Sequence, residues 1–256
     1  MRRAAILGTC FLVGCATRQV PVVHVGAPPP DSKILDTPFC EPPEPADALL
    51  LETQGFPSDP YQRGVAAVLL PEGSRVLDMV VMPSFEPEHA VYVETEPTGG
   101  CQVTKAVAAE SVWHVGYDHW LDNQRPLPAL PPARRQSRSI SAATCQRLRA
   151  LWDVALSGRK PPGPNSAFGA DGSFCASIPI DGTNFHFRDR TSNGWRAGET
   201  PRGKAQPNVR ALVALGKALA RYPSTASDEQ ERLDAELGRQ ADDLADRFRR
   251  AAKATP

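Results

Sequence analysis

The sequence feature that most constrains the fold is the pair Asp181-Gly182, which lies between two runs of alternating apolar and polar residues. Asp-Gly is a strong signal for a two-residue β-hairpin turn, because both positions can adopt positive φ angles at low cost. The alternation around it predicts one strand over residues 174–180 and a second strand that starts at Thr183. At least one antiparallel strand pair is therefore expected in the second half of the chain.

The hydrophobic pattern also sets the register of this hairpin. Ile178 is expected opposite Phe185, and Ala176 opposite Phe187, so that the apolar side chains share one face of the sheet. Pro179 has no backbone N–H to donate, and proline is tolerated in a sheet mainly at an edge. The first strand of the hairpin is therefore predicted to be an edge strand.

Alternation with a period of two recurs upstream of the hairpin, and helical periodicity occurs on both sides of it. Further strands are predicted over 75–82, 90–95, 101–107 and 111–117, and helices over 142–157, from Pro207 to Pro223 and from Ser227 onward. The ambiguous apolar runs 46–51 and 65–70 are assigned as one helix and one strand, and no regular element is expected over 122–139 or 190–206. The predicted fold class is α+β, with an antiparallel β-sheet or meander covered by two to three helices, plus a charged C-terminal helix.

The last helix is expected to be amphipathic. Ser227 and Gln230 form a capping-box pattern at its start. A narrow apolar stripe then follows at helical spacing, formed by Leu233, Leu237, Ala241, Leu244 and Phe248. If this stripe were exposed, it would favour pairing of the helix with another protein.

The first residues have the layout of a secretory signal, with Arg2-Arg3 before an apolar run over 4–13 that is too short to span a bilayer. The run ends in Leu12-Val13-Gly14-Cys15, which resembles the lipobox of bacterial lipoproteins. The resemblance covers residues 1–15, and it implies cleavage before Cys15 and lipid attachment to that residue. Ala16 follows in place of an aspartate, which in Gram-negative lipoproteins points to the outer membrane, here on its periplasmic side.

This interpretation divides the chain into a signal peptide (1–14), a Pro-rich tether (15–47), one globular domain (48–223) and the C-terminal helix (224–256). A Pro-rich chain prefers an extended form that rises about 3.1 Å per residue, so the tether can hold the domain away from the lipid. Basic and acidic residues each number 29. A net charge of zero, together with this location, disfavours nucleic acid as a partner.

Four cysteines remain after the one in the signal peptide and the lipidated one are set aside: Cys40, Cys101, Cys145 and Cys175. An even number in an oxidising compartment predicts two disulfides, with three possible connectivities. Pairing neighbours along the chain gives Cys40 with Cys101 and Cys145 with Cys175. The hairpin register argues against the second pair, because Cys175 would point away from the sheet face that the helix of Cys145 should cover. The wide spacing does not fit a zinc site, and no metal or cofactor is expected.

The densest group of potential acid-base or metal-binding residues is His114, Asp118 and His119. On a strand, His114 and Asp118 share one face while His119 points to the other, so their convergence would require a turn after Gly116. A metal would also need a further protein ligand from elsewhere. A metal-dependent hydrolase that uses these residues is one alternative function, and ordinary exposed residues at a strand end are the competing interpretation.

A second group combines an indole ring with cations: Trp195, Arg188, Arg190, Arg196, Arg202 and Lys204. Trp and Arg are the residues that most often contribute binding energy at protein interfaces. The competing interpretation is a solvated basic loop whose Trp195 folds back onto the core. If this patch binds a ligand, its charge suits an acidic protein surface, lipid phosphates or cell-wall carboxylates.

The sequence contains neither a nucleophile elbow nor a Gly-rich phosphate loop between a strand and a helix, so an enzyme is the less expected class. The expected function is a lipid-anchored periplasmic binding module that recognises a protein or an envelope component. One version is an inhibitor or immunity-type lipoprotein. A structural envelope lipoprotein that pairs through its C-terminal helix is a further alternative.

Overall fold

The computed structural model describes residues 49–51, 56–96, 100–122, 125–159, 182–200 and 207–254. The strands are β1 (Leu50–Leu51), β2 (Arg75–Pro83), β3 (His89–Thr95), β4 (Cys101–Ala108), β5 (Ala133–Ile140), β6 (Thr183–Thr191) and β7 (Gly194–Glu199). The helices are α1 (Pro60–Leu69), α2 (Val112–Leu121), α3 (Ala142–Ser157), α4 (Pro207–Arg221) and α5 (Ser227–Ala254), with a 3-10 turn η2 (Tyr222–Ser224). All of them belong to one compact unit, Cys40–Pro256. The predicted α+β class is confirmed.

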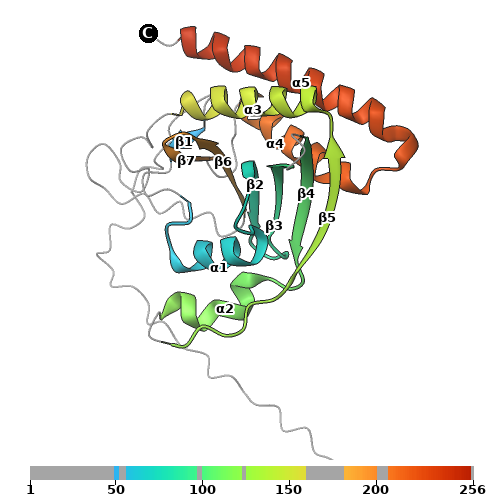
Figure 1. Cartoon of the computed structure of the whole chain (residues 1–256). Helices are drawn as coiled ribbons and strands as arrows, with labels where there is room; N and C mark the ends of the chain where they lie inside the picture. Colours follow the sequence, from blue (N-terminus) through green and yellow to red (C-terminus); the bar gives the residue numbers. More distant parts are fainter. Residues whose placement is uncertain are drawn as a thin grey trace, which may run out of the picture. The chain divides into compact units, whose positions relative to one another are not determined.

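The strands form one antiparallel sheet in the order β1-β7-β6-β2-β3-β4-β5 (Figure 1). The chain lays down β2 to β5 as neighbours, and the β6–β7 hairpin then adds to the other side of β2. β2 therefore lies inside the sheet, and six consecutive residues of it are buried. This explains its Val- and Met-rich sequence, because a strand covered on both faces has no polar side.

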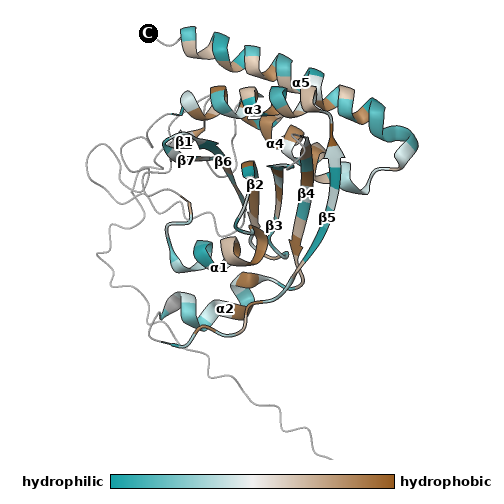
Figure 2. Cartoon of the chain, in the orientation of Figure 1, coloured by the Kyte–Doolittle hydropathy of each residue, from teal (hydrophilic) through white to brown (hydrophobic). Residues whose placement is uncertain are grey.

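Helices cover both faces of the sheet (Figures 1 and 2). The sequence predicted that helices cover the sheet but did not predict that they lie on both of its faces. On one face, α3, α4 and α5 pack against alternate residues of the inner strands, such as Leu77, Met79 and Val91. On the other face, α1 and α2 pack against the intervening residues, such as Val80 and Tyr92. The sheet thus separates two apolar cores. We call the first the α3–α5 face and the second the α1–α2 face.

Local caps begin the helices that the sequence predicted best. The Ser141 side chain accepts a hydrogen bond from the Thr144 backbone N–H, and Gly158 ends α3, as expected. The predicted start of α4 at Pro207 is also confirmed.

Gly216 lets α4 approach β2 closely, because a Cβ atom there would lie 2.3 Å from the Met79 Sδ. Trp152 of α3 is buried and donates to the Asp78 carbonyl oxygen at 3.2 Å.

The apolar stripe of α5 is not exposed. Leu237, Ala241, Leu244 and Phe248 are buried in the core of the α3–α5 face. The predicted capping box is not observed, because the Gln230 side-chain oxygen accepts from the Arg138 guanidinium at 3.2 Å and its amide nitrogen donates to the Ser139 carbonyl oxygen at 3.3 Å. The exposure that would have favoured a structural pairing helix is therefore not found. No helix in the described ranges is both long and apolar enough to cross a lipid bilayer.

The segment 111–117 was predicted as a strand and is instead the start of α2. Its alternation of large apolar residues resembles a strand pattern, but a distant carboxylate contributes to the outcome. Glu88 is fully buried, and it accepts hydrogen bonds from the backbone N–H groups of Val112 (2.7 Å) and Trp113 (3.0 Å). These are N–H groups that a helix start leaves without partners, so Glu88 stabilises a helix here.

Three other segments also differ from the sequence prediction. The stretch 122–139 includes most of β5, which lacks alternation because most of its side chains are exposed at the sheet edge. The stretch 190–206 contains β7, which pairs with β6 through a turn in which Gly194 adopts a φ of 110°. Near the N-terminal end, the strand comes first, as β1, and the helix second, as α1. For β5 and β7, pairing with a neighbouring strand decides the local structure, whereas α1 begins at a local cap, in which the Asp59 side chain accepts from the Gln62 backbone N–H at 2.8 Å.

The predicted register of the first hairpin strand is wrong at Phe187, where Ala176 was expected. His186 pairs with Val80 on one side and Glu199 on the other, and Phe187 likewise pairs with both β2 and β7. Both sides of these residues are therefore paired, so the predicted strand 174–180 cannot pair with them. The strand 174–180 and Asp181 lie outside the described residues. The start of the second strand at Thr183 is confirmed.

The predicted disulfide connectivity is also wrong. Cys101, at the start of β4, is bonded to Cys145 on α3, with 6.2 Å between their Cα atoms. Both residues are buried on the α3–α5 face, so the bridge fastens a helix to the sheet that it covers. Cys40 and Cys175 lie outside the described residues. Because Cys145 is bonded to Cys101, the expected pair of Cys145 with Cys175 does not form.

Candidate functional site

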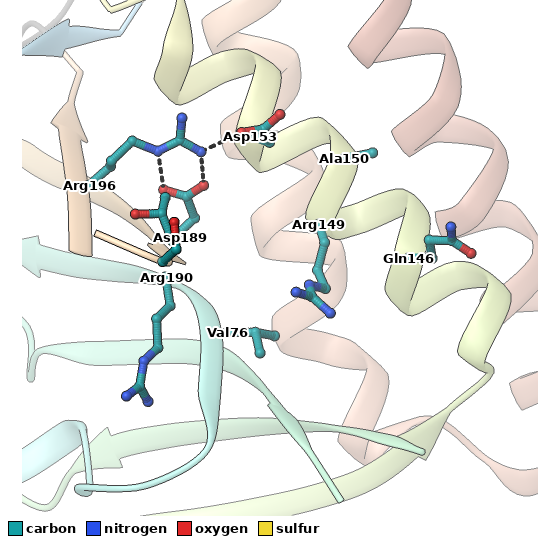
Figure 3. A pocket seen from close by; sticks show the side chains of 10 residues that line it. Val76, Gln146, Arg149, Ala150, Asp153, Asp189, Arg190 and Arg196 are labelled. Atoms are coloured by element: carbon teal, nitrogen blue, oxygen red, sulfur yellow. Dashed lines mark hydrogen bonds and ion pairs between the residues drawn. The ribbon is translucent and has the colours of Figure 1, made fainter. Parts of the chain in front are cut away.

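A hollow of about 530 Å³ lies between α3 and the end of the β6–β7 hairpin (Figure 3). Its lining comes from β2, α3 and the hairpin: Val76, Gln146, Arg149, Ala150, Asp153, Asp189, Arg190, Thr191, Ser192 and Arg196. Arginine and aspartate dominate this lining, and Val76 and Ala150 supply the apolar part. We call this site the arginine hollow.

One wall of the arginine hollow is an ion-pair cluster centred on Arg196. Its Nε donates to Asp189 at 2.9 Å and its Nη2 to Asp153 of α3 at 2.6 Å, and Nη2 also contacts the second Asp189 oxygen. Nη1 donates to Ser157 at 2.7 Å. The hydrogen bonds that Arg196 donates to Asp189 raise the pKa of Arg196, against the opposing effect of partial burial. This cluster joins the hairpin to α3, and its two carboxylates outnumber its one guanidinium, so it keeps one net negative charge.

Two other arginines of the arginine hollow lack such compensation. Arg149 is exposed on α3 and makes no hydrogen bond or ion pair with any residue that the structure describes. Arg190 is exposed on β6 and, among the residues that the structure describes, donates to the Gly73 carbonyl oxygen alone, at 3.2 Å. Figure 3 shows Arg149 reaching from α3 toward Val76, and Arg190 extending from β6 away from the Arg196 cluster. Arg149 therefore presents a guanidinium group with no described carboxylate bound to it. Arg190 pairs with Trp195 across the hairpin, so its side chain lies on the opposite face of β6 from Asp189 and Arg196, at the edge of the hollow.

The hairpin turn adds fixed polar groups at the rim. The Thr191 hydroxyl donates to the Gly194 carbonyl oxygen at 2.9 Å and accepts from the Asn193 backbone N–H at 3.1 Å. These bonds close the turn locally. Ser192, at the tip, is exposed and lines the hollow. A ligand held by the arginines would meet this hydroxyl beside them.

Arg188 points to the α1–α2 face and is buried. It binds the buried Asp78 through two hydrogen bonds, from Nε at 2.9 Å and from Nη2 at 2.7 Å. Arg75 also donates to Asp78, at 3.0 Å, and burial lowers the pKa of Arg75. The Arg188 guanidinium lies 4.9 Å from the ring centres of both Phe56 and Trp195. Arg188 thus belongs to the interior of the fold.

Trp195 lies between the two interpretations offered by the sequence. Its ring packs on the guanidinium groups of Arg75 (5.1 Å) and Arg188 (4.9 Å), yet 38% of the residue stays exposed. It lies on β7 rather than in a loop, and its side chain is on the face opposite to Arg196. The last two members of the predicted basic patch, Arg202 and Lys204, are outside the described residues.

The proposed hydrolase residues do not converge. His114 and Asp118 are exposed on α2, and Asp118 pairs with Arg125 at 3.0 Å. The His119 Nδ1 lies 2.5 Å from the Arg125 carbonyl oxygen. Within the described ranges, no group of three or more His, Cys, Asp or Glu side chains could hold a metal ion. Asp118 and His119 instead fasten the end of α2 to the segment that follows it.

Sequence reasoning missed the contribution of α3 to the site. Arg149 and Asp153 are four residues apart on the exposed side of a helix whose buried side was predicted correctly. The sequence offered no signal for them, because a charged pair at this spacing is usual on solvated helix faces. Their importance comes from the hairpin that lies beside them. No protein-family model, curated protein or solved structure matches this chain.

Proposed function

We propose that this chain is a lipid-anchored binding protein of the bacterial cell envelope, and that its arginine hollow recognises an anionic group of a protein or an envelope component. The observation that carries the proposal is the contrast within one site. Arg196 is bound by two aspartates, whereas Arg149 in the hollow and Arg190 at its edge have no described carboxylate partner. The resemblance of Leu12-Val13-Gly14-Cys15 to a lipobox supports the anchor.

The chemistry of the lining favours an anion. A guanidinium group presents a planar set of donors that matches the oxygens of carboxylate and phosphate groups. The aspartate oxygens of the wall are already engaged by Arg196, which limits their repulsion of an incoming anion. The apolar surface of Val76 and Ala150 excludes water from part of the site and strengthens each charge interaction. An inhibitor or immunity-type lipoprotein is one form that this function can take.

The first test removes the two uncompensated charges. The double variant Arg149→Gln and Arg190→Gln, the wild type and the control Arg250→Gln are each immobilised and exposed to envelope extract. Arg250 is an exposed arginine near the end of α5, outside the hollow. Charge-assisted hydrogen bonds contribute about 1.5–3 kcal/mol each, so the double variant should retain a specific component at least about tenfold less well. Mass spectrometry quantifies what is retained.

The control should behave like the wild type, and added salt should release the component from both. If the double variant retains the same components in the same amounts as the wild type, the hollow is not the binding site. If Arg250→Gln loses them equally, the retention reflects overall charge.

The second test concerns the anchor. Cys15→Ser should yield a precursor that stays in the aqueous phase of a detergent partition, because it lacks the acyl chains that hold a lipoprotein at a membrane. Mass spectrometry of the wild type should show the acylated Cys15 peptide. A variant that partitions like the wild type would contradict lipid attachment at this residue.

A further inference from the structure

The sheet has one long edge strand. β5 pairs with β4 over eight residues, from Cys101 opposite Ile140 to Ala108 opposite Ala133, and no described strand pairs with its other side. At the opposite edge, the two residues of β1 pair with β7. Figure 1 shows β5 as the outermost strand, with no described element drawn beyond its first half. An edge of this kind can accept another strand.

The hydrogen-bond pattern shows which residues of β5 face outward. The backbone N–H of Ala109 donates to the Pro132 carbonyl oxygen at 2.8 Å. Bonded pairs alternate with non-bonded pairs in an antiparallel ladder, so Arg134 and Gln136 bond toward β4. The backbone groups of Ala133, Arg135 and Ser137 must then point away from the sheet. These three residues offer three N–H and three C=O groups.

The far end of β5 is already covered. The Ser139 carbonyl oxygen, which continues the outward series, accepts hydrogen bonds from the Tyr222 hydroxyl (3.0 Å) and from the Gln230 side chain (3.3 Å). Residues of η2 and α5 therefore close the edge at this point. The outward groups of 133–137 have no corresponding partner among the described residues. The open length is thus about five residues, close to the length of a typical strand.

The charge of this edge is of one sign. β5 contains Arg134, Arg135 and Arg138 and no acidic residue. Arg135 donates to the Val68 carbonyl oxygen at 2.7 Å, and Arg138 to the Thr225 carbonyl oxygen at 2.7 Å. None of the three forms an ion pair with a carboxylate in the described part of the chain. Arg134 and Arg135 are exposed, so their charges face solvent at the edge, whereas Arg138 is partly buried against Thr225 and Gln230.

This charge determines which kind of strand can pair. A second copy of β5 would bring arginines opposite arginines, and like charges on neighbouring strands are destabilising. Cations on an edge ordinarily prevent such self-pairing. The same cations attract a strand that carries glutamate or aspartate. We propose that β5 accepts an acidic extended segment of a partner protein, which pairs with the outward groups of residues 133–137 as an additional antiparallel strand.

This surface is separate from the arginine hollow. The hollow lies at β6, β7 and α3, and β5 lies at the other edge of the sheet. The two proposals can therefore fail independently. The shared feature is a preference for acidic groups at both sites.

The experiment uses the full-length chain in detergent and a synthetic acidic probe, the acetylated and amidated heptapeptide Thr-Glu-Val-Glu-Val-Glu-Thr. Hydrogen–deuterium exchange with mass spectrometry follows the β5 fragment. Bound peptide should slow exchange of this fragment at least about fivefold, because the outward amides gain partners. A matched peptide with lysine in place of each glutamate should have no effect. The double variant Arg149→Gln and Arg190→Gln should respond like the wild type.

Two variants at one residue separate strand pairing from other effects. Ser137→Pro removes one outward N–H and leaves the ladder to β4 intact, so it should abolish the protection. Ser137→Ala removes the hydroxyl that bonds to Thr104 and keeps the N–H, so it should respond like the wild type. The variant Arg134→Gln with Arg135→Gln leaves the ladder untouched and should bind at least about tenfold more weakly.

The proposal is overturned if millimolar acidic peptide gives no protection of β5. It is also overturned if the lysine peptide protects β5 equally, or if Ser137→Pro is protected like Ser137→Ala. Concentration-dependent dimerisation through β5 in place of peptide binding would show that the edge pairs with itself. Without peptide, the other strands of each variant should exchange as slowly as those of the wild type, which confirms that the variant is folded.

Discussion

Arg188 and Arg149 lie beside the same sheet, but one is buried and paired with a carboxylate and the other is exposed. Arg188 points to the α1–α2 face, is buried, and binds Asp78 through two hydrogen bonds. Arg149 lies on the outer side of α3, next to the hollow, and has no described partner. Arg196 is intermediate, because it is partly exposed and bound by Asp189 and Asp153.

The difference shows that a cluster of arginines in sequence does not identify the ones that can bind a ligand. A buried guanidinium must be neutralised, because an unpaired charge in the interior costs several kcal/mol. A cation becomes available for binding only where the fold leaves it at the surface without a carboxylate. The following predictions test this division, beginning with the largest expected effect.

Arg188→Met should lower the free energy of unfolding by about 3–5 kcal/mol, because it removes the bidentate partner of a buried carboxylate. The matched variant Arg149→Met should change it by less than about 0.5 kcal/mol, as expected for an exposed side chain. Urea denaturation of both variants provides the measurement. Equal effects of the two substitutions would remove the distinction between the two arginines.

Arg196→Gln should have an intermediate effect, a loss of about 1–2 kcal/mol in the free energy of unfolding. Asp189, whose side chain is only 9% exposed, would lose its cation, whereas Asp153 remains largely solvated. The same variant should weaken binding of an anion in the hollow, because two aspartates then stand without compensation. Unfolding curves and retention of the captured component are measured on the same preparation. A loss of stability as large as that of Arg188→Met would show that Arg196 contributes to stability as much as a buried, paired arginine does.

Salt should affect ligand binding at the hollow more than it affects the buried pair of Arg188 and Asp78, but this difference is smaller than the effects of the substitutions above. Binding at the exposed Arg149 and Arg190 should weaken severalfold when ionic strength rises from about 0.05 to about 0.5 M, because the screening length falls to a few ångströms. The destabilisation caused by Arg188→Met should change little over this range, since a buried pair is screened weakly. Retention and unfolding are each followed against salt concentration. Salt-independent retention would indicate a ligand held mainly by apolar contacts.

His89 is a third case, in which burial disfavours the charged form of the side chain, and its expected effect is the smallest. Burial lowers the pKa of His89 below its ordinary value of 6.5, and the neighbouring Lys105 and Lys217 add to this shift, while the Pro87 carbonyl and Glu86 oppose it. The unfolded state then binds the proton more tightly than the folded state. Stability should therefore fall as the pH decreases from about 6.5 toward the lowered pKa. Replacement by Gln should flatten this part of the pH profile of unfolding, and an unchanged profile would contradict the assignment.

Part of the fold could be predicted because its signals are local. The strands β2, β3 and β4 follow from their composition and alternation, and α3 follows from Ser141, its buried stripe and Gly158. The candidate site was predicted only in part. Arg190 and Arg196 were named from the sequence, whereas Arg149 was not, because its neighbour is a hairpin distant in the chain.

The sequence by itself determined those segments whose stabilising groups lie within a few residues of each other, including caps, turns and repeating apolar positions. The tertiary structure contributed to the formation of the helix 112–121, because Glu88 binds its first N–H groups in addition to the local cap from Ser111. It also decided the Cys101–Cys145 bond and the burial of Arg188 against Asp78, which lies 110 residues earlier in the chain. The physical reason is that charge compensation and strand pairing depend on which groups meet in space, and local periodicity carries no information about a partner so far away in the chain.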